Sequence, residues 1–379
     1  MIDFATFLRN LLLFWLLIYA MGLAIKRLKR IEYLKLGLFY LEVSANPKWL
    51  SWLISPLSRI LGPLHRVSVI STLILSSLSS IYLVKVTVDS LIGPKVAQVV
   101  PVIPGVTLDI TVPSLLAIFL VLLVHEVFGH ATLSHYFRVP VKKIAFFVLF
   151  FLMGAFVEPD EESLGKMDSK RKMGIYSAGV FANTITFFLF LLITILIFPG
   201  FSLDVNAAKP SGVYVEKVIK GGPSWEVLPE GVVLRGINGY KVSDLATLSE
   251  SLRKFKPGDS VILVTDRGNF TVRLGSRPDD PSIPYLGVQL HPVPYFDSIL
   301  PMPPVITVQV LETLVLTMAF SIGLAAINSL PILPLDGGLI LMEYLKRYFE
   351  EDLARKLAWT VSAPFALILI YNALIFFLG

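Results

Sequence analysis

Six long apolar runs constrain the fold of this chain more than any other feature of its sequence. A helix that crosses a lipid bilayer needs about 20 mostly apolar residues, because backbone polar groups in lipid must be satisfied within the protein. The runs are Phe7–Ile25, Val67–Val86, Pro113–Phe137, Gly174–Phe198, Val305–Asn328 and Leu357–Leu378. Because 55% of the residues are hydrophobic and only 16% are charged, the sequence predicts a polytopic α-helical membrane protein with about six transmembrane helices.

Lysine and arginine residues gather in short loops beside these runs. Dense clusters occur at 26–35, 138–143 and 346–356. Cytosolic loops of membrane proteins carry an excess of such residues, and all three clusters fall on one side when the runs alternate in direction. This topology accounts for the net charge of +5, so we expect no nucleic-acid partner.

Two segments between the runs favour extended backbone. Residues 139–157 are rich in Val, Ile and Phe and too short for a comfortable span, so we expect a membrane-embedded β-hairpin. Non-helical backbone at that depth is tolerated only against protein or a wet cavity, so the hairpin should line a site. Residues 207–290 alternate in strand fashion around a short amphipathic helix, which predicts one small β-rich soluble domain, extracytoplasmic by this topology.

The third apolar run carries an ionisable cluster, HEVFGH, which begins at His125 and ends at His130. Ionisable side chains are costly inside a bilayer, so they indicate a functional site. Asp336 lies in a second polar stretch, NSLPILPLDG, at residues 328–337. Because the chain has no cysteine, only imidazole and carboxylate groups are available as strong metal ligands. We interpret the two stretches as the halves of a zinc site.

The spacing of the two histidines departs from the usual metalloprotease pattern. In HExxH the histidines are four apart and share one helix face, and the glutamate faces the reacting water. His125 and His130 are five apart, which separates them by about 140° on a regular helix. A π-bulge around Phe128 would return both rings to one face. The residues also allow a ligand set of His130, Glu126 and Asp336. This set leaves no evident general base to take the proton of the reacting water.

Together these motifs resemble the site-2 protease family of zinc-dependent intramembrane metalloproteases. Its members combine HExxH in one membrane helix with NxxPxxxxDG in a later one, often with a PDZ domain between them. Asn328, Pro331, Asp336 and Gly337 match the second motif without gaps. The run GHATLSHYFRV aligns with the family, so the additional residue lies just upstream of it.

The resemblance implies a role for each residue of the site. His125, His130 and Asp336 would bind Zn²⁺. Glu126 would act as general base, and Asn328 would position the substrate backbone or stabilise the oxyanion. Residues expected to bind substrate lie in the hairpin and in the fourth run, namely Gly154, Ala155, Phe156 and Asn183. For Asn183, helix packing alone is an equal alternative.

The soluble domain resembles a PDZ domain in the order of its pieces. Ser211–Val215 looks like the carboxylate-binding loop and its strand, and Leu248–Leu252 would lie on the groove helix. Such a domain would bind substrate C-termini. We therefore divide the chain into transmembrane segments (1–112), the first half of the membrane core (113–206), the PDZ-like domain (207–290), and the second half of the core with the last helix (291–379).

The expected protein is a multi-pass zinc endopeptidase of the cell membrane that cleaves transmembrane segments of substrate proteins within the lipid bilayer. Two alternatives are open. A catalytically inactive relative would bind membrane partners through its PDZ-like domain, and metal analysis would distinguish it. A transporter would use the intramembrane His and Asp residues for protons or metal ions, but the paired inverted repeats that favour a transporter are not evident.

Overall fold

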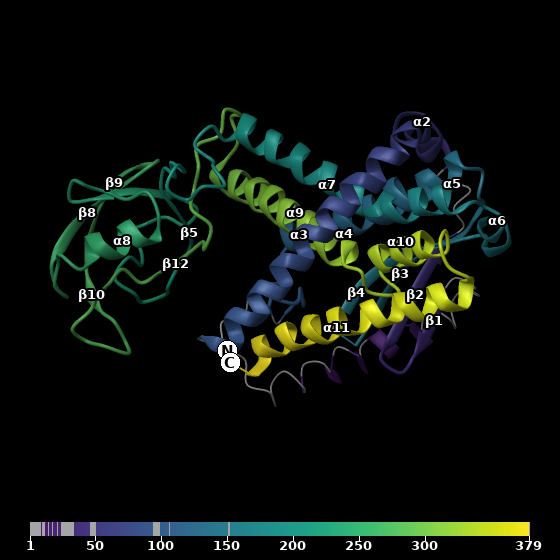
Figure 1. The fold of residues 1–379 in the computed structure, drawn as a ribbon. Coiled ribbons are helices and arrows are strands. Elements are labelled where there is room, and N and C mark those ends of the chain that lie inside the picture. Colours follow the sequence, from purple (N-terminus) through teal and green to yellow (C-terminus); the bar gives the residue numbers. More distant parts are fainter. Residues whose placement is uncertain are drawn as a thin grey trace. The chain divides into compact units, whose positions relative to one another are not determined.

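The structure is a computed structural model that describes residues 9, 12–13, 15–16, 18–20, 22–23, 34–45, 51–93, 99–105, 107–150 and 152–378 (Figure 1). The chain divides into two compact units, which are described separately. We call residues 1–188 with 317–379 the helical unit and residues 189–316 the β-rich unit.

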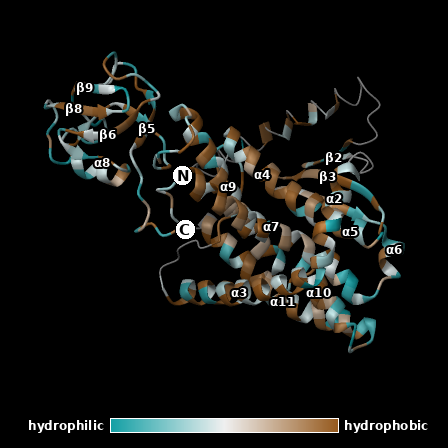
Figure 2. Cartoon of the chain, turned by 90° about the horizontal axis from the view of Figure 1, so that it is seen from above, coloured by the Kyte–Doolittle hydropathy of each residue, from teal (hydrophilic) through white to brown (hydrophobic). Residues whose placement is uncertain are grey.

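Five helices in the described part of the chain are long and apolar enough to cross a membrane (Figure 2). They are α2 Ser51–Leu61 continued through η2 Gly62–Leu64 into α3 His65–Ile92, α4 Val112–Leu123 continued through η3 Val124–Ala131 into α5 Thr132–Tyr136, α7 Ser169–Ile197, α9 Pro304–Ser329, and α11 Glu351–Leu378. They correspond to five of the six predicted runs. The first run, Phe7–Ile25, lies mostly outside the described residues.

Polar residues mark where two of these helices begin. Thr111 Oγ1 accepts the N–H of Ser114 at 3.2 Å, and Ser114 Oγ accepts the N–H of Thr111 at 2.9 Å, which forms a capping box before α4. Asp168 Oδ1 accepts the N–H groups of Lys170 and Arg171 at the start of α7. These bonds satisfy first-turn amides that have no partner within the helix.

The predicted hairpin is present and belongs to a larger sheet. Strands β3 Val141–Leu149 and β4 Leu152–Pro159 pair antiparallel, and β1 Leu34–Gly37 and β2 Tyr40–Ala45 extend them into a four-stranded sheet of order β1-β2-β3-β4. The two additional strands were not predicted. Strand β4 is an edge strand of this sheet, so one side of its backbone faces away from β3.

Short elements complete the helical unit. Helix α6, Glu161–Gly165, follows the sheet and leads to α7. Helix α10, Asp336–Leu345, follows the proline-containing turn after α9. Gly337 has no room for a side chain, because a Cβ there would collide with the main-chain oxygens of Ser329 and Leu330. The glycine therefore lets the start of α10 pack directly on the end of α9.

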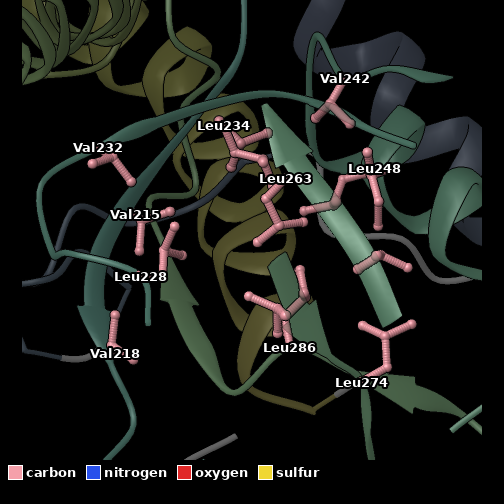
Figure 3. Packing of buried hydrophobic residues seen from close by; sticks show 14 residues of the cluster. Val215, Val218, Leu228, Val232, Leu234, Val242, Leu248, Leu263, Leu274 and Leu286 are labelled. Atoms are coloured by element: carbon pink, nitrogen blue, oxygen red, sulfur yellow. The ribbon is translucent and has the colours of Figure 1, made fainter. Parts of the chain in front are cut away.

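The β-rich unit contains one main sheet of order β12-β5-β6-β8-β9, with β7 paired to β6. Its strands are β5 Val213–Val218, β6 Val233–Ile237, β7 Tyr240–Lys241, β8 Ser260–Thr265, β9 Gly268–Arg273 and β12 Val288–Leu290, beside a second pair, β10 Gly275–Ser276 and β11 Pro284–Tyr285. Helix α8, Leu245–Leu252, begins at a capping box formed by Asp244 and Thr247. Alternate strand residues and Leu248 of α8 fill the core (Figure 3), which confirms the predicted β-rich domain.

The β-rich unit extends beyond the predicted boundaries of 207–290. The ends of α7 and α9 pack in it through a cluster that contains Phe198, Phe296, Leu311 and Leu314. Both helices are continuous in the structure, so each contributes residues to both units. The four-part division given above stays a prediction.

Candidate metal centre and peptide groove

The predicted π-bulge is present and extends over the whole histidine motif. Residues Val124–Ala131 form the π-helix η3. A π-helix has more residues per turn than an α-helix, so a spacing of five returns to the same face. As a result, Nε2 of His125 lies 3.3 Å from Nε2 of His130.

Asp336 is the first residue of α10, and its carboxylate lies beside the two imidazoles. Its Oδ2 lies 3.3 Å from Nε2 of His125 and 3.3 Å from Nε2 of His130. The three ligand atoms form a group suited to a metal ion, and the corresponding group in the described residues contains His125 and not Glu126. The geometry therefore favours the first of the two ligand sets that the sequence allows.

The outer nitrogens of both imidazoles are held by helix α7. Nδ1 of His130 donates to the carbonyl oxygen of Ile175 at 2.9 Å, which leaves the Nε2 lone pair directed at the centre. Nδ1 of His125 lies 3.2 Å from Nδ2 of Asn183, and the two ends of a side-chain amide are exchanged by a 180° rotation. An amide turned with Oδ1 toward the ring accepts the Nδ1 proton and likewise leaves Nε2 as a ligand. That orientation also gives a partner to Oδ1 of Asn183, a buried atom with none among the described residues.

Two glycines allow α7 to approach the histidine motif. A Cβ at Gly179 would lie 2.5 Å from Nε2 of His130 and 2.6 Å from Nε2 of His125. A Cβ at Gly129 would lie 2.6 Å from Cα of Gly179. The sequence suggested helix packing as one possible role for Asn183 in this segment, but it did not assign Gly179 to the metal centre.

The residues present fit a catalytic zinc ion. Asp336 is only 9% exposed, and its Oδ2 has no hydrogen-bond partner in the described residues, which is costly for a buried carboxylate. Ligands about 2.0–2.1 Å from a tetrahedral zinc ion lie about 3.3–3.4 Å from one another. All three separations here are 3.3 Å. Two imidazoles and one carboxylate are a donor set of catalytic zinc sites, which keep a fourth position for water or substrate.

Glu126 points toward the edge of the four-stranded sheet. Its Oε2 accepts the main-chain N–H of Val157 at 2.9 Å. Val157 belongs to β4, as do Gly154, Ala155 and Phe156. A Cβ at Gly154 would lie 2.7 Å from Cε1 of Phe147, so glycine is required for this aromatic ring to cover the strand. The hairpin therefore lies beside the histidine motif, as expected of a segment that lines the site.

Asn328 lies in the last turn of α9 and is half-buried. The hydrogen bonds and ion pairs of His125, Glu126, His130 and Asp336 in the described chain do not involve Asn328 or Gly154–Phe156. Their predicted roles toward substrate stay predictions. Asn183 is brought against His125, a contact that the sequence did not predict.

A sequence profile of Peptidase family M50 matches residues 113–371. This span is more than half of the chain and contains both motifs of the metal centre. The chain belongs to peptidase family M50. The resemblance to site-2 proteases is thereby confirmed, and membership of this family indicates a metallopeptidase.

A curated relative of this M50 chain is the uncharacterized protein MJ0971 of Methanocaldococcus jannaschii. The two sequences are 27% identical over 229 residues, which cover 60% of this chain and 55% of the relative. The chain thus spans about half the length of the curated relative that it matches.

Solved structures with similarity to the M50 chain include three small proteins. The PDZ domain of the SdrC-like protein of Listeria monocytogenes is 24% identical, with a TM-score of 0.20, and its Listeria innocua counterpart is 21% identical, also at 0.20. GtR34C of Geobacillus thermodenitrificans is 26% identical, with a TM-score of 0.19. Each alignment covers 21% of this chain and, in the same order, 87%, 93% and 95% of the other.

The β-rich unit of the M50 chain has a groove, but not where Ser211–Val215 predicted it. A cavity lies between α8 and residues 283–290, and it is lined by Leu248, Leu252 and Leu290 among others. Strand β5 cannot offer an edge to a peptide, because β12 and β6 flank it on both sides. Val213 and Val215 are fully buried in the core. The groove strand is therefore β12, whereas the predicted groove helix is confirmed as one wall.

Proposed function

We propose that this chain is a zinc-dependent intramembrane endopeptidase that cleaves transmembrane segments of membrane-protein substrates. The observation that carries the proposal is the convergence of two imidazole Nε2 atoms and one carboxylate Oδ2 at 3.3 Å. Membership of peptidase family M50 supports the reaction class. Five long apolar helices in the described chain support a site at membrane depth.

Glu126 is the proposed general base. A bound zinc ion supplies the Lewis acidity that makes a water molecule nucleophilic at neutral pH. The hydrogen bond from Val157 orients the Glu126 carboxylate through Oε2, so we assign Oε1 to accept the proton of the attacking water. The same carboxyl group then returns a proton to the departing amine.

Strand β4 is the proposed docking edge for the substrate. The N–H of Val157 points away from β3 toward Glu126, so Ala155 and Met153, two and four residues earlier, present their backbone groups on the same edge. A substrate segment that unwinds can pair with them as an additional strand. Such a strand runs toward Val157 and brings a peptide bond beside Glu126. Asn328 is retained as a residue that positions the substrate backbone.

The decisive experiment is proteolysis by the purified chain in lipid nanodiscs with a tagged transmembrane substrate. Glu126→Gln should lower the cleavage rate by about 100-fold or more and leave zinc content unchanged, because a general base contributes at least that factor. Glu161→Gln, which changes an exposed carboxylate of α6, should cleave like wild type. Undiminished cleavage by Glu126→Gln would disprove the assignment, and a wild-type chain without zinc would favour the inactive relative.

The groove of the β-rich unit is the proposed site for substrate C-termini. Strand β12 is an edge strand, so an extended peptide can pair with it beside α8. The lining contains Arg253 and Arg277 but no acidic residue, which favours peptides with acidic residues near an apolar end. Fluorescence anisotropy with the full chain should show that an acidic peptide with a free C-terminus binds more tightly than its amidated or lysine-substituted forms. Equal binding of all three would contradict this specificity.

The β-rich unit is proposed to be extracytoplasmic. Because the chain has no cysteine, single cysteines in place of the exposed Lys220 and Lys166 report topology directly. In intact cells a membrane-impermeant maleimide should label the cysteine at 220 and not the one at 166. The reverse pattern would invert the proposed topology.

A further inference from the structure

Glu343 is a buried carboxylate to which neither the motifs nor the proposed reaction assigns a role. It lies in α10 and is only 2% exposed. Its Oε2 accepts a hydrogen bond from Oγ of Ser169 at 2.9 Å. Its Oε1 lies 3.4 Å from Nζ of Lys346 and 3.9 Å from Nζ of Lys172. A buried charge is costly unless it is paired and hydrogen-bonded, and these contacts meet that condition.

The partners of Glu343 place it between two helices that build the metal centre. Ser169 and Lys172 belong to the first turn of α7. The same helix accepts the Nδ1 proton of His130 at Ile175 and approaches both imidazoles at Gly179. Helix α10 begins with Asp336. Glu343 therefore joins the helix that supplies the aspartate to the helix that holds the histidines.

Because of the position of Glu343 along α10, this contact restrains the orientation of the helix. Residues seven apart on an α-helix lie about 20° from the same face and about 10 Å apart along the axis. Asp336 and Glu343 have this spacing, so their carboxylates lie on one face of α10. The Asp336 carboxylate contacts the histidines that α7 holds, and the Glu343 carboxylate contacts α7 itself. Two points of contact define both the rotation and the axial position of α10. A single contact at Asp336 would leave the helix free to turn about it.

We propose that Glu343 is a positioning residue that sets the rotation of α10 and thereby holds Asp336 at the two imidazoles. The proposal rests on the zinc site proposed above. A leucine of similar size would fill the same space without the cost of burying a charge. The carboxylate instead specifies one alignment of α10 on α7, because its hydrogen bond from Ser169 and its ion pair with Lys172 require that alignment.

The test measures metal binding by the full chain in detergent micelles. Glu343→Leu should raise the Kd for zinc at least tenfold, measured by competition with a chromophoric chelator. It should also alter the visible absorption of Co²⁺ bound in place of zinc, which reports the coordination geometry. Glu343→Gln keeps an acceptor for Ser169 and should fall between wild type and Glu343→Leu. The thermal midpoint of the metal-free protein should change little, which separates positioning from a loss of folding.

Glu350→Leu is the matched control, because Glu350 is an exposed carboxylate just before α11. It should leave both the zinc Kd and the Co²⁺ spectrum unchanged. If wild type binds neither metal, the proposed function fails. If wild type binds but Glu343→Leu keeps the wild-type Kd and spectrum, the positioning role alone fails. Should Glu343→Leu not fold, unchanged metal binding in both Glu343→Gln and Ser169→Ala would overturn it as well.

Discussion

Nε2 of His125 lies 3.3 Å from Nε2 of His130 although the two residues are five positions apart in the chain. This separation arises because residues Val124–Ala131 form a π-helix. The additional residue of HEVFGH is therefore accommodated by the backbone and does not turn one imidazole away from the other.

Deletion of Phe128 should preserve the metal centre. The shortened motif places its histidines four apart, and a regular α-helix then presents both on one face. We expect the zinc Kd to stay within about tenfold of wild type (1.4 kcal/mol). Insertion of one alanine after Phe128 should abolish zinc uptake, and the same insertion after Lys166, in an exposed turn, should not. Loss of zinc from the deletion variant would contradict the equivalence of the two helix geometries.

Gly179→Ala should weaken metal binding by displacing the imidazoles. The new methyl group meets Nε2 of His130 at 2.5 Å, so at least one ligand must move. We expect the zinc Kd to rise at least tenfold, or about 1.4 kcal/mol. Gly323→Ala in α9 is the control, because a Cβ there meets no atom within 4 Å. Equal zinc affinities of the two variants would show that the helices adjust without disturbing the site.

Asn183→Leu should lower zinc affinity by about 10-fold to 100-fold, the usual effect of removing a group that orients a metal-bound histidine. Asn183→Asp should retain most of the affinity, because a carboxylate oxygen accepts the Nδ1 proton of His125. Asn372→Leu removes another buried asparagine, one that donates to Thr87, and should affect stability but not the zinc Kd. A normal Kd for Asn183→Leu would support the packing role instead.

Asp297 should contribute to stability only above acidic pH. Hydrogen bonds from the Arg235 guanidinium lower the pKa of this carboxyl group below its usual value. A lowered carboxyl pKa stabilises the folded state above the unfolded pKa of about 3.9, and the contribution is lost as the pH falls through the folded pKa. Because the Asp297 side chain is 62% exposed, solvent screening limits the effect to about 1 kcal/mol or less.

The measurement for Asp297 compares the thermal unfolding of wild type and Asp297→Asn at several pH values. The wild-type chain should unfold at a higher temperature at pH 7, and the difference should shrink below about pH 4. Asp259→Asn, which changes a carboxylate elsewhere in the β-rich unit that has no ion pair among the described contacts, controls for general charge effects. A difference that grows toward low pH would refute the assigned sign.

Sequence reasoning succeeded where the deciding signal is local. The apolar runs, the ligand types and the need for a bulge all follow from composition and from the angle between neighbouring helix residues. The strand content of residues 139–157 was also readable, because Val, Ile and Phe favour extended backbone. Strands β1 and β2 were missed because β2 pairs with β3, about a hundred residues downstream, and β1 joins the sheet through β2.

The position of the groove in the β-rich unit also depends on strand pairing between distant segments, which the local sequence does not reveal. Ser211–Val215 has the local pattern of a groove strand, but the neighbours of a strand in a sheet decide whether it has a free edge. Those neighbours are β6 and the distant β12, so β5 has no free edge and β12 is the edge strand.

The sequence by itself determined which groups can bind a metal here, because histidine and carboxylate are the only strong ligands in a cysteine-free chain. It also predicted that His125 and His130 can share one helix face only with a π-bulge, because a spacing of five separates them by about 140° on a regular α-helix. Only the tertiary structure decided how these groups are held, through Gly179, Asn183 and Glu343. The reason is physical: each of these residues acts on a partner in another helix, and such contacts depend on packing that no local periodicity encodes.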